Sequence, residues 1–188
     1  MQQRHLFLCG FRGSGKTSVA RLLGETYELP VVDLDEVVQT DAGRTIREIF
    51  DEGGEQVFRD FETVALGTIA QGPTAVIALG GGAILREKNR EIIRSGGHVV
   101  WLDAPADVIA VRIQGDAASR QQRPPLTALP AEVEIETTLD QRRPLYEAVA
   151  DHRVATDGLS VRQVAQKIQT LWSPTDTDAD PLPESFAG

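Results

Sequence analysis

One eight-residue stretch constrains the fold of this chain more than any other. Residues 10–17 read Gly-Phe-Arg-Gly-Ser-Gly-Lys-Thr and match the phosphate-loop pattern G-x-x-x-x-G-K-[ST] in full. The apolar run Leu6–Cys9 precedes the loop, and a helical pattern over about 15–25 follows it. A glycine-rich loop between a buried strand and a helix predicts an α/β protein that binds phosphate groups at the ends of its strands.

The residue types of the loop match the chemistry of a bound nucleoside triphosphate. Glycines let backbone N–H groups turn toward phosphate oxygens, and the helix N-terminus adds the positive end of its dipole. The Lys16 ammonium is expected to reach the β- and γ-phosphates, and the Thr17 hydroxyl to bind Mg²⁺. Cys9, directly before the loop, is expected to be a small core residue.

Strand and helix patterns alternate along the rest of the chain, which predicts a parallel sheet covered on both faces. The apolar runs do not alternate in polarity, as expected of strands buried on both sides. The predicted strands are 6–9, 30–33, 74–79, 98–102 and 152–155. The predicted helices are 15–25, 42–71 in two pieces broken at Gly53-Gly54, 86–95, 106–113, 132–150, and 160–171 with Ser160 as N-cap.

The net charge of −9 over 188 residues argues against a nucleic-acid groove or an anionic membrane as the partner. Residues 173–188 hold three prolines, four acids and no base, and are interpreted as a disordered acidic tail behind a domain of residues 1–172. The segment 115–131 is polar and rich in Arg, Gln and Pro, and it is not expected to form a packed element. A single cysteine favours a reducing compartment, hence the cytoplasm, and the three scattered histidines argue against a zinc site.

Two carboxylates follow the second predicted strand. Asp33 and Asp35 come 16 and 18 residues after Thr17, at the sheet edge where ligands of open α/β folds bind. One could join the Mg²⁺ shell while the other accepts a hydroxyl proton from a substrate. The alternative is an acidic turn in which an aspartate caps the next helix.

Among the classes of protein that use a phosphate loop, the sequence favours a small-molecule kinase. A GTPase would need a guanine-reading Asn-Lys-x-Asp, which the sequence lacks, and motor or AAA-type ATPases need a longer chain. Against this background the sequence resembles the shikimate kinase family. The resembling segments occur in the family's order: GFRGSGKTS at 10–18, VDLDE at 32–36, GRTIREIF at 43–50, EQVFRDFE at 55–62, GGG at 80–82, RPPL at 123–126 and RRPLY at 142–146.

The resemblance implies a three-layer P-loop NTPase fold of the nucleoside-monophosphate-kinase type, with a mobile lid at about 115–131. It implies transfer of the ATP γ-phosphoryl group to the 3-hydroxyl of shikimate, giving shikimate 3-phosphate and ADP on the chorismate route to aromatic amino acids. Asp33 would be the outer-shell metal carboxylate, and Arg123 a lid arginine that closes over the phosphates. The phosphates would be held by Lys16 and by the backbone of Gly13, Ser14, Gly15, Lys16, Thr17 and Ser18.

The same resemblance implies which residues would bind shikimate. Asp35 would orient, and could deprotonate, the substrate hydroxyl. Arg59 and Arg142 would clamp the carboxylate, and the Gly81 backbone would contact the ring hydroxyls. The family pattern Arg-x-Pro-x-Tyr selects Arg142 over its neighbour Arg143. A small carboxylate with three hydroxyls independently calls for planar cationic forks and polar partners of this kind.

Some choices stay open at this level. Either Arg112 or Arg120 would assist ATP binding, and adenine would pack near Thr156-Asp157-Gly158. Pro125 departs from the commoner Arg-Pro-Leu-Leu pattern and stiffens the lid. The chain is expected to be a monomer. The rival functions are a related kinase acting on a substrate such as gluconate, and a non-catalytic nucleotide-responsive binding module.

Overall fold

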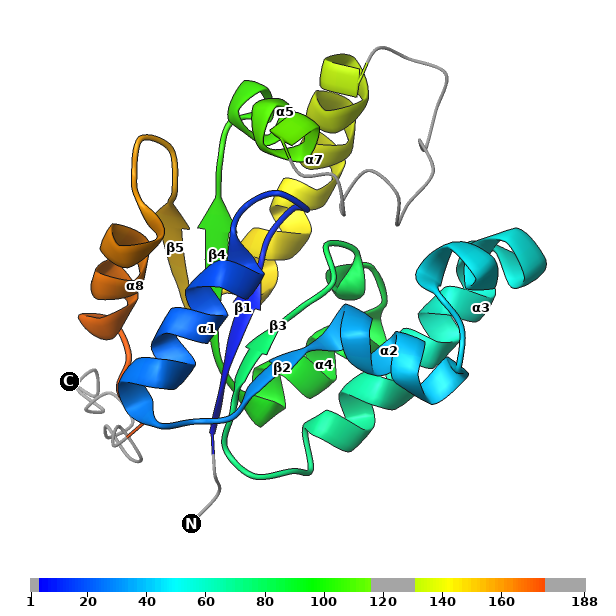
Figure 1. Cartoon of the computed structure of the whole chain (residues 1–188), viewed down its shortest axis with the longest axis horizontal. Coiled ribbons are helices and arrows are strands. Elements are labelled where there is room, and N and C mark those ends of the chain that lie inside the picture. The colour runs from blue at the N-terminus through cyan, green and yellow to red at the C-terminus, as the bar shows by residue number, and fades with distance from the viewer. Residues whose placement is uncertain (1–3, 116–130, 175–188) are drawn as a thin grey trace, which may run out of the picture.

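The computed structural model describes residues 4–115 and 131–174, and these form a five-stranded parallel sheet (Figure 1). The strands lie in the order β2-β3-β1-β4-β5, so the phosphate-loop strand β1 is central. This confirms the predicted sheet. The bounds are β1 His5–Cys9, β2 Val31–Asp33, β3 Val76–Ala78, β4 Gly97–Asp103 and β5 His152–Ala155.

Helices cover both faces of the sheet, as predicted (Figure 1). None of the helices in the described ranges is long and apolar enough to cross a membrane. Arg120, Arg123 and nearly all of the predicted lid lie outside the described residues, as do residues 175–188 of the predicted tail. The bounds are α1 Lys16–Tyr27, α2 Leu34–Ala42, α3 Ile46–Ile69, α4 Glu87–Gly96, α5 Ala106–Gly115, α7 Ala131–Val149 and α8 Val161–Gln169, with a short 3-10 helix at Ala83–Leu85.

Strand β1 divides the core between the two faces. Side chains alternate along a strand, so Leu6 and Leu8 face one layer while Phe7 and Cys9 face the other. The first pair packs with α1 and α8, and the second pair packs with α2, α3, α4 and α7. Because β1 is buried on both faces, the loop that follows it is fixed to the most rigid part of the molecule.

The structure corrects the prediction between the second and third strands. A helix begins already at Leu34, directly after β2, where the sequence was expected to become helical only from residue 42. The Asp33 side chain accepts a hydrogen bond from the Asp35 backbone N–H and so caps α2. Gly43 ends that helix, with its N–H bonded to the Gln39 and Thr40 carbonyls.

Helix α3 contains the break expected at Gly53-Gly54, as a kink within a continuous element. Gly54 has φ 73° and ψ −176°, a conformation that residues with a β-carbon essentially never adopt. The helix starts from a capping box in which Thr45 and Glu48 satisfy each other's backbone N–H groups. The kink separates a first segment that begins at Ile46 from the segment that carries Arg59 and Glu62.

Gly54 and Gly67, both in α3, offer a matched test of this kink. A β-carbon at either position would meet no atom within 4 Å, so backbone conformation alone separates them. We expect Gly54→Ala to lower the free energy of unfolding by about 1–3 kcal/mol, because of its backbone conformation. We expect Gly67→Ala, inside regular helix, to raise it by up to about 1 kcal/mol. Urea denaturation measures both, and equal effects at the two positions would contradict the strained kink.

Candidate active site

The predicted site residues that the structure describes lie together at one edge of the sheet. Parallel strands end together, so the residues that follow β1, β2 and β3 meet at their carboxyl ends. Helices α5 and α7 rise over this edge (Figure 1), and a small apolar cluster joins them to the loop through Phe11, Ile109 and Leu139. We call the following residues the strand-end site: Lys16, Thr17, Asp33, Asp35, Arg59, Gly80–Gly82 and Arg142.

Lys16 lies over the phosphate loop. Its side-chain ammonium donates hydrogen bonds to the carbonyls of Gly10, at 2.9 Å, and Phe11, at 2.8 Å. The side chain is buried, so its charge acts in a region of reduced dielectric, where its attraction for an anion is strong. The thiol of Cys9 lies beneath, and burial raises its pKa to about 12, although the Lys16 charge works in the opposite direction. Cys9 is therefore a protonated core residue, as expected.

The side chains of Thr17, at the start of α1, and Asp33, at the end of β2, form a hydrogen-bonded pair of oxygen groups. The Thr17 hydroxyl donates to Asp33 Oδ2 at 2.8 Å, while Asp33 Oδ1 accepts from the Asp35 N–H at 3.0 Å. Asp33 therefore caps α2, as the alternative interpretation of this segment predicted, and its second carboxylate oxygen is hydrogen-bonded to the residue that follows Lys16. Hard oxygen ligands suit Mg²⁺, which takes few protein ligands and keeps waters and phosphates. Within the described ranges, no three metal-binding side chains gather into a cluster.

The three consecutive glycines 80–82 bring the two sides of the site together. A β-carbon at Gly82 would lie 2.3 Å from Arg59 Nη2, so the guanidinium packs directly on the glycine backbone. A β-carbon at Gly80 would lie 2.7 Å from Asp35 Oδ1 and 2.9 Å from Glu62 Oε1. Because residues 80–82 have no side chains, a cation and two carboxylates can pack against their backbone.

Arg59 is held by two carboxylates of its own helix. Glu62 accepts from Nη1 at 2.9 Å, and Glu55 accepts from Nη2 at 3.0 Å. Burial works to lower the pKa of Arg59, but the charge and hydrogen bonds of Glu62, and then those of Glu55, outweigh it and raise the pKa. Arg59 is therefore a permanent buried cation in a fixed orientation.

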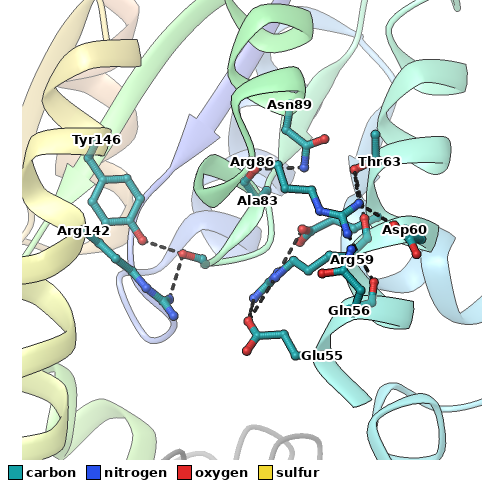
Figure 2. Close-up of polar contacts among 12 residues, drawn as sticks. Glu55, Gln56, Arg59, Asp60, Thr63, Ala83, Arg86, Asn89, Arg142 and Tyr146 are labelled. Carbon is teal, nitrogen blue, oxygen red and sulfur yellow. Dashed lines mark hydrogen bonds and ion pairs between the residues drawn. The ribbon is translucent and has the colours of Figure 1, made fainter. Parts of the chain in front are cut away.

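Arg142 and Arg143, adjacent on α7, point to different places. Arg142 Nη1 donates to the Gly81 carbonyl at 3.1 Å, and Figure 2 shows Arg142 and Arg59 extending toward one another from α7 and α3. Arg143 instead pairs with Asp103, at 3.6 Å, and Asp140, also at 3.6 Å. The structure thus brings Arg142, and not Arg143, to the glycine segment.

Helical periodicity contains a signal for this choice that the sequence analysis did not use. The buried apolar residues of α7 are Ile135, Leu139, Tyr146 and Val149. At about 100° per residue, position 142 lies within the helix face that they share, because it is seven residues from both Ile135 and Val149, whereas position 143 is rotated to the edge of that face. Glu62 was also missed as a functional partner, although its i, i+3 spacing from Arg59 predicts a pair on one helix face.

Arg112 links the loop to the turn after β5. Its guanidinium donates to Thr156 Oγ1 at 2.9 Å and to the Thr156 carbonyl at 2.8 Å, and it approaches the Gly13 carbonyl at 3.4 Å. The segment Thr156–Gly158 is therefore tied to the edge of the phosphate loop. Of the two arginines considered for the nucleotide side, Arg112 lies at this edge, and Arg120 is outside the described residues.

Comparison with known proteins gives a consistent family. The sequence model of the shikimate kinase family matches residues 12–172. A shikimate kinase of Rhodopirellula baltica is 44% identical over 168 residues, which cover 89% of this chain and 90% of that protein. The solved structure of shikimate kinase from Acinetobacter baumannii in complex with shikimate superposes with a TM-score of 0.84 at 35% identity, covering 89% of this chain and 92% of that one.

A gluconokinase structure from Sinorhizobium meliloti also superposes, with a TM-score of 0.59 over 88% of this chain and 89% of that one. Its sequence identity is only 17%, so the likeness shows a shared fold and nothing about the substrate.

Glu62 and Glu55 provide a test of how Arg59 is held. Both carboxylates bind the same guanidinium, but the Glu62 side chain is 0% exposed and that of Glu55 is 53% exposed. We expect Glu62→Ala to lower the free energy of unfolding by about 3–5 kcal/mol, because it leaves a buried charge without its main counter-ion. We expect Glu55→Ala to cost at most about 1 kcal/mol. Chemical denaturation of the two variants measures the difference, and similar losses would argue against the buried pair as the anchor of Arg59.

Proposed function

This chain belongs to the shikimate kinase family and phosphorylates shikimate with ATP as co-substrate, and we propose that the 3-hydroxyl is the acceptor and that the strand-end site performs the reaction. The observation that carries the proposal is the meeting of three groups at Gly80–Gly82. Two arginines from different helices and the carboxylate of Asp35 face this segment, which lies directly beside the phosphate loop: a β-carbon at Gly81 would be 3.1 Å from the Arg12 backbone nitrogen. That arrangement suits a small anionic polyol beside a nucleotide.

The substrate carboxylate binds between Arg59 and Arg142. A guanidinium presents paired N–H donors that match the two oxygens of a carboxylate, and a pair of such forks fixes the plane of the bound acid. The bare backbone at Gly81 contacts the ring hydroxyls. Glu62 and Glu55 keep Arg59 oriented before the substrate arrives, so less conformational entropy is lost on binding.

Asp35 orients the attacking hydroxyl and accepts its proton. Asp33 is engaged by the Thr17 hydroxyl and the Asp35 N–H, which supports Asp35 as the carboxylate that faces the substrate. In the transfer, the 3-oxygen forms a bond to the γ-phosphorus while the bond from that phosphorus to the β–γ bridging oxygen breaks, and ADP leaves. Positioning and charge neutralisation supply most of the catalysis in such a reaction.

The nucleotide phosphates bind to the backbone from Gly13 to Ser18 and to the Lys16 ammonium. Thr17 would hold Mg²⁺ and Asp33 would join its outer shell, since hydroxyl and carboxylate oxygens are ligands that suit this ion. When bound, the ion neutralises charge on the phosphates. Arg112 and the turn Thr156–Gly158 form the adenine side. Arg123, outside the described residues, keeps the role of lid arginine from the sequence resemblance.

The remaining expectations belong to the same proposal. The catalytic unit is residues 1–172 with a lid at about 115–131, and residues 173–188 form an acidic tail. The enzyme acts as a cytoplasmic monomer without nucleic-acid or membrane partners. A reduced cytoplasm suits the lone cysteine, Cys9, which is buried.

The function is tested by coupling ADP release to a spectroscopic readout with Mg-ATP and one acceptor at a time. We expect turnover with shikimate and none above background with gluconate. Asp35→Asn serves as the control for a contaminating kinase, and its rate should fall by about 100-fold or more, the upper range for a lost general base. A wild-type enzyme that turns over gluconate but not shikimate would overturn the proposal in favour of the rival kinase.

Arg142 and Arg143 form a natural pair for testing the carboxylate clamp. We expect Arg142→Ala to lower kcat/KM for shikimate by about 100-fold or more, because it removes a charged, two-pronged contact to a desolvated anion. The KM for ATP should stay nearly constant. Arg143→Ala, which loses ion pairs to Asp103 and Asp140, should change kcat/KM by about threefold or less, the range of a partly exposed ion pair. The reverse ranking would assign the clamp to Arg143.

A further inference from the structure

Tyr146 ends in a buried hydroxyl beside the proposed substrate site. The residue is 0% exposed, and its ring stacks on Trp101 of β4 with the centroids 5.6 Å apart and the planes 17° apart. The hydroxyl donates to the Gly81 carbonyl at 2.6 Å. Because the ring is packed between a helix and the sheet, the hydroxyl occupies one fixed point relative to the strand ends.

The Gly81 carbonyl accepts from two side chains of α7. Tyr146 and Arg142 are four residues apart, so they lie on the same face of the helix. Figure 2 shows both reaching the same carbonyl oxygen, whose two lone pairs can accept both donors. One peptide group therefore joins the tyrosine to the arginine.

This joint adds to the local hydrogen bonds of the glycine segment. The carbonyls of Gly80 and Gly82 accept from the backbone N–H groups of Ala83 and Leu85, and the Gly81 carbonyl between them accepts from the side chains of α7. Arg142 is only partly buried, and its long side chain has many rotamers. Pro144, between the two donors, has no N–H to bond the carbonyl of Asp140, so the helix is held less firmly at this turn.

We propose that Tyr146 is a positioning residue for substrate binding. Its hydroxyl fixes the Gly81 peptide group, and through that shared carbonyl it sets the direction in which Arg142 presents its guanidinium to the substrate carboxylate. The inference rests on the proposed function of Arg142 and deepens it. Without the hydroxyl, the carbonyl is left to Arg142, which is drawn toward the backbone and away from the substrate.

A second tyrosine supplies a matched control for the test. Tyr27, at the opposite end of α1 from the phosphate loop, packs edge-on against Trp172 and donates its hydroxyl to the Trp172 carbonyl at 3.0 Å. Tyr146→Phe and Tyr27→Phe therefore each remove one tyrosine-to-backbone hydrogen bond beside a tryptophan. Both variants keep the aromatic ring, and a thermal-unfolding measurement confirms that each is folded.

The kinetic experiment compares the two variants with shikimate and ATP varied separately. We expect Tyr146→Phe to raise the KM for shikimate by about 3- to 10-fold, the effect of one hydrogen bond, with less than a twofold change in the KM for ATP. Tyr27→Phe should leave both constants unchanged. An unchanged shikimate KM in Tyr146→Phe, or equal increases for both substrates, would overturn the proposal and leave Tyr146 a structural residue.

The double variant Tyr146→Phe/Arg142→Ala identifies the route of the effect. If Tyr146 acts through Arg142, adding Tyr146→Phe to Arg142→Ala should lower kcat/KM for shikimate by less than about twofold, because coupled sites are not additive. The same 3- to 10-fold loss in both backgrounds would show an effect independent of Arg142 and would overturn the proposal. A wild-type enzyme inactive on shikimate would instead refute the proposed function itself, so the two failures are distinguishable.

Discussion

The packing of Arg59 on the bare backbone of Gly82 is the constraint on which the site depends. A β-carbon at that glycine would overlap the guanidinium, so the cation can reach the strand ends only because the residue has no side chain. Arg59 is in turn oriented by Glu62, which is fully buried, and by Glu55 at the surface. The charge of a buried cation must be balanced by nearby negative charge and hydrogen-bond acceptors. The positions of α3, the glycine segment and the two carboxylates therefore depend on one another.

The same glycine segment organises the opposite side of the site. Arg142 and Tyr146 of α7 share the Gly81 carbonyl, and Asp35 faces Gly80 from the start of α2. Side chains of α2, α3 and α7 therefore meet on three consecutive residues that follow β3. A substrate carboxylate and a substrate hydroxyl can then be held by groups whose relative positions are set before binding, which limits the entropy lost in forming the complex.

The placement of the residues on the nucleotide side depends mainly on the backbone geometry of short segments. The loop between β1 and α1 places Lys16 and Thr17 by chain geometry alone, and Asp33 meets Thr17 because β2 ends at the same edge. Sequence reasoning was accordingly strongest here, and it also gave the parallel sheet and its five strands. It was wrong about where the helix after β2 begins: Asp33 caps a helix that starts at Leu34, directly after the strand.

Arg59 and Arg142 became candidates only through the resemblance to a known family. By itself the sequence determined the phosphate loop and the alternation of strands and helices. These follow from patterns within a few residues, where backbone geometry and hydrophobic periodicity act directly. Only the tertiary structure decided which side chains touch: that Arg142 faces Gly81 while Arg143 faces Asp103, that Arg59 lies on Gly82, and that Tyr146 shares a carbonyl with Arg142. Adjacent residues on a helix point about 100° apart, so their destinations depend on how the helix is rotated against the rest of the core. That rotation is fixed by packing between distant segments, as when Tyr146 stacks on Trp101.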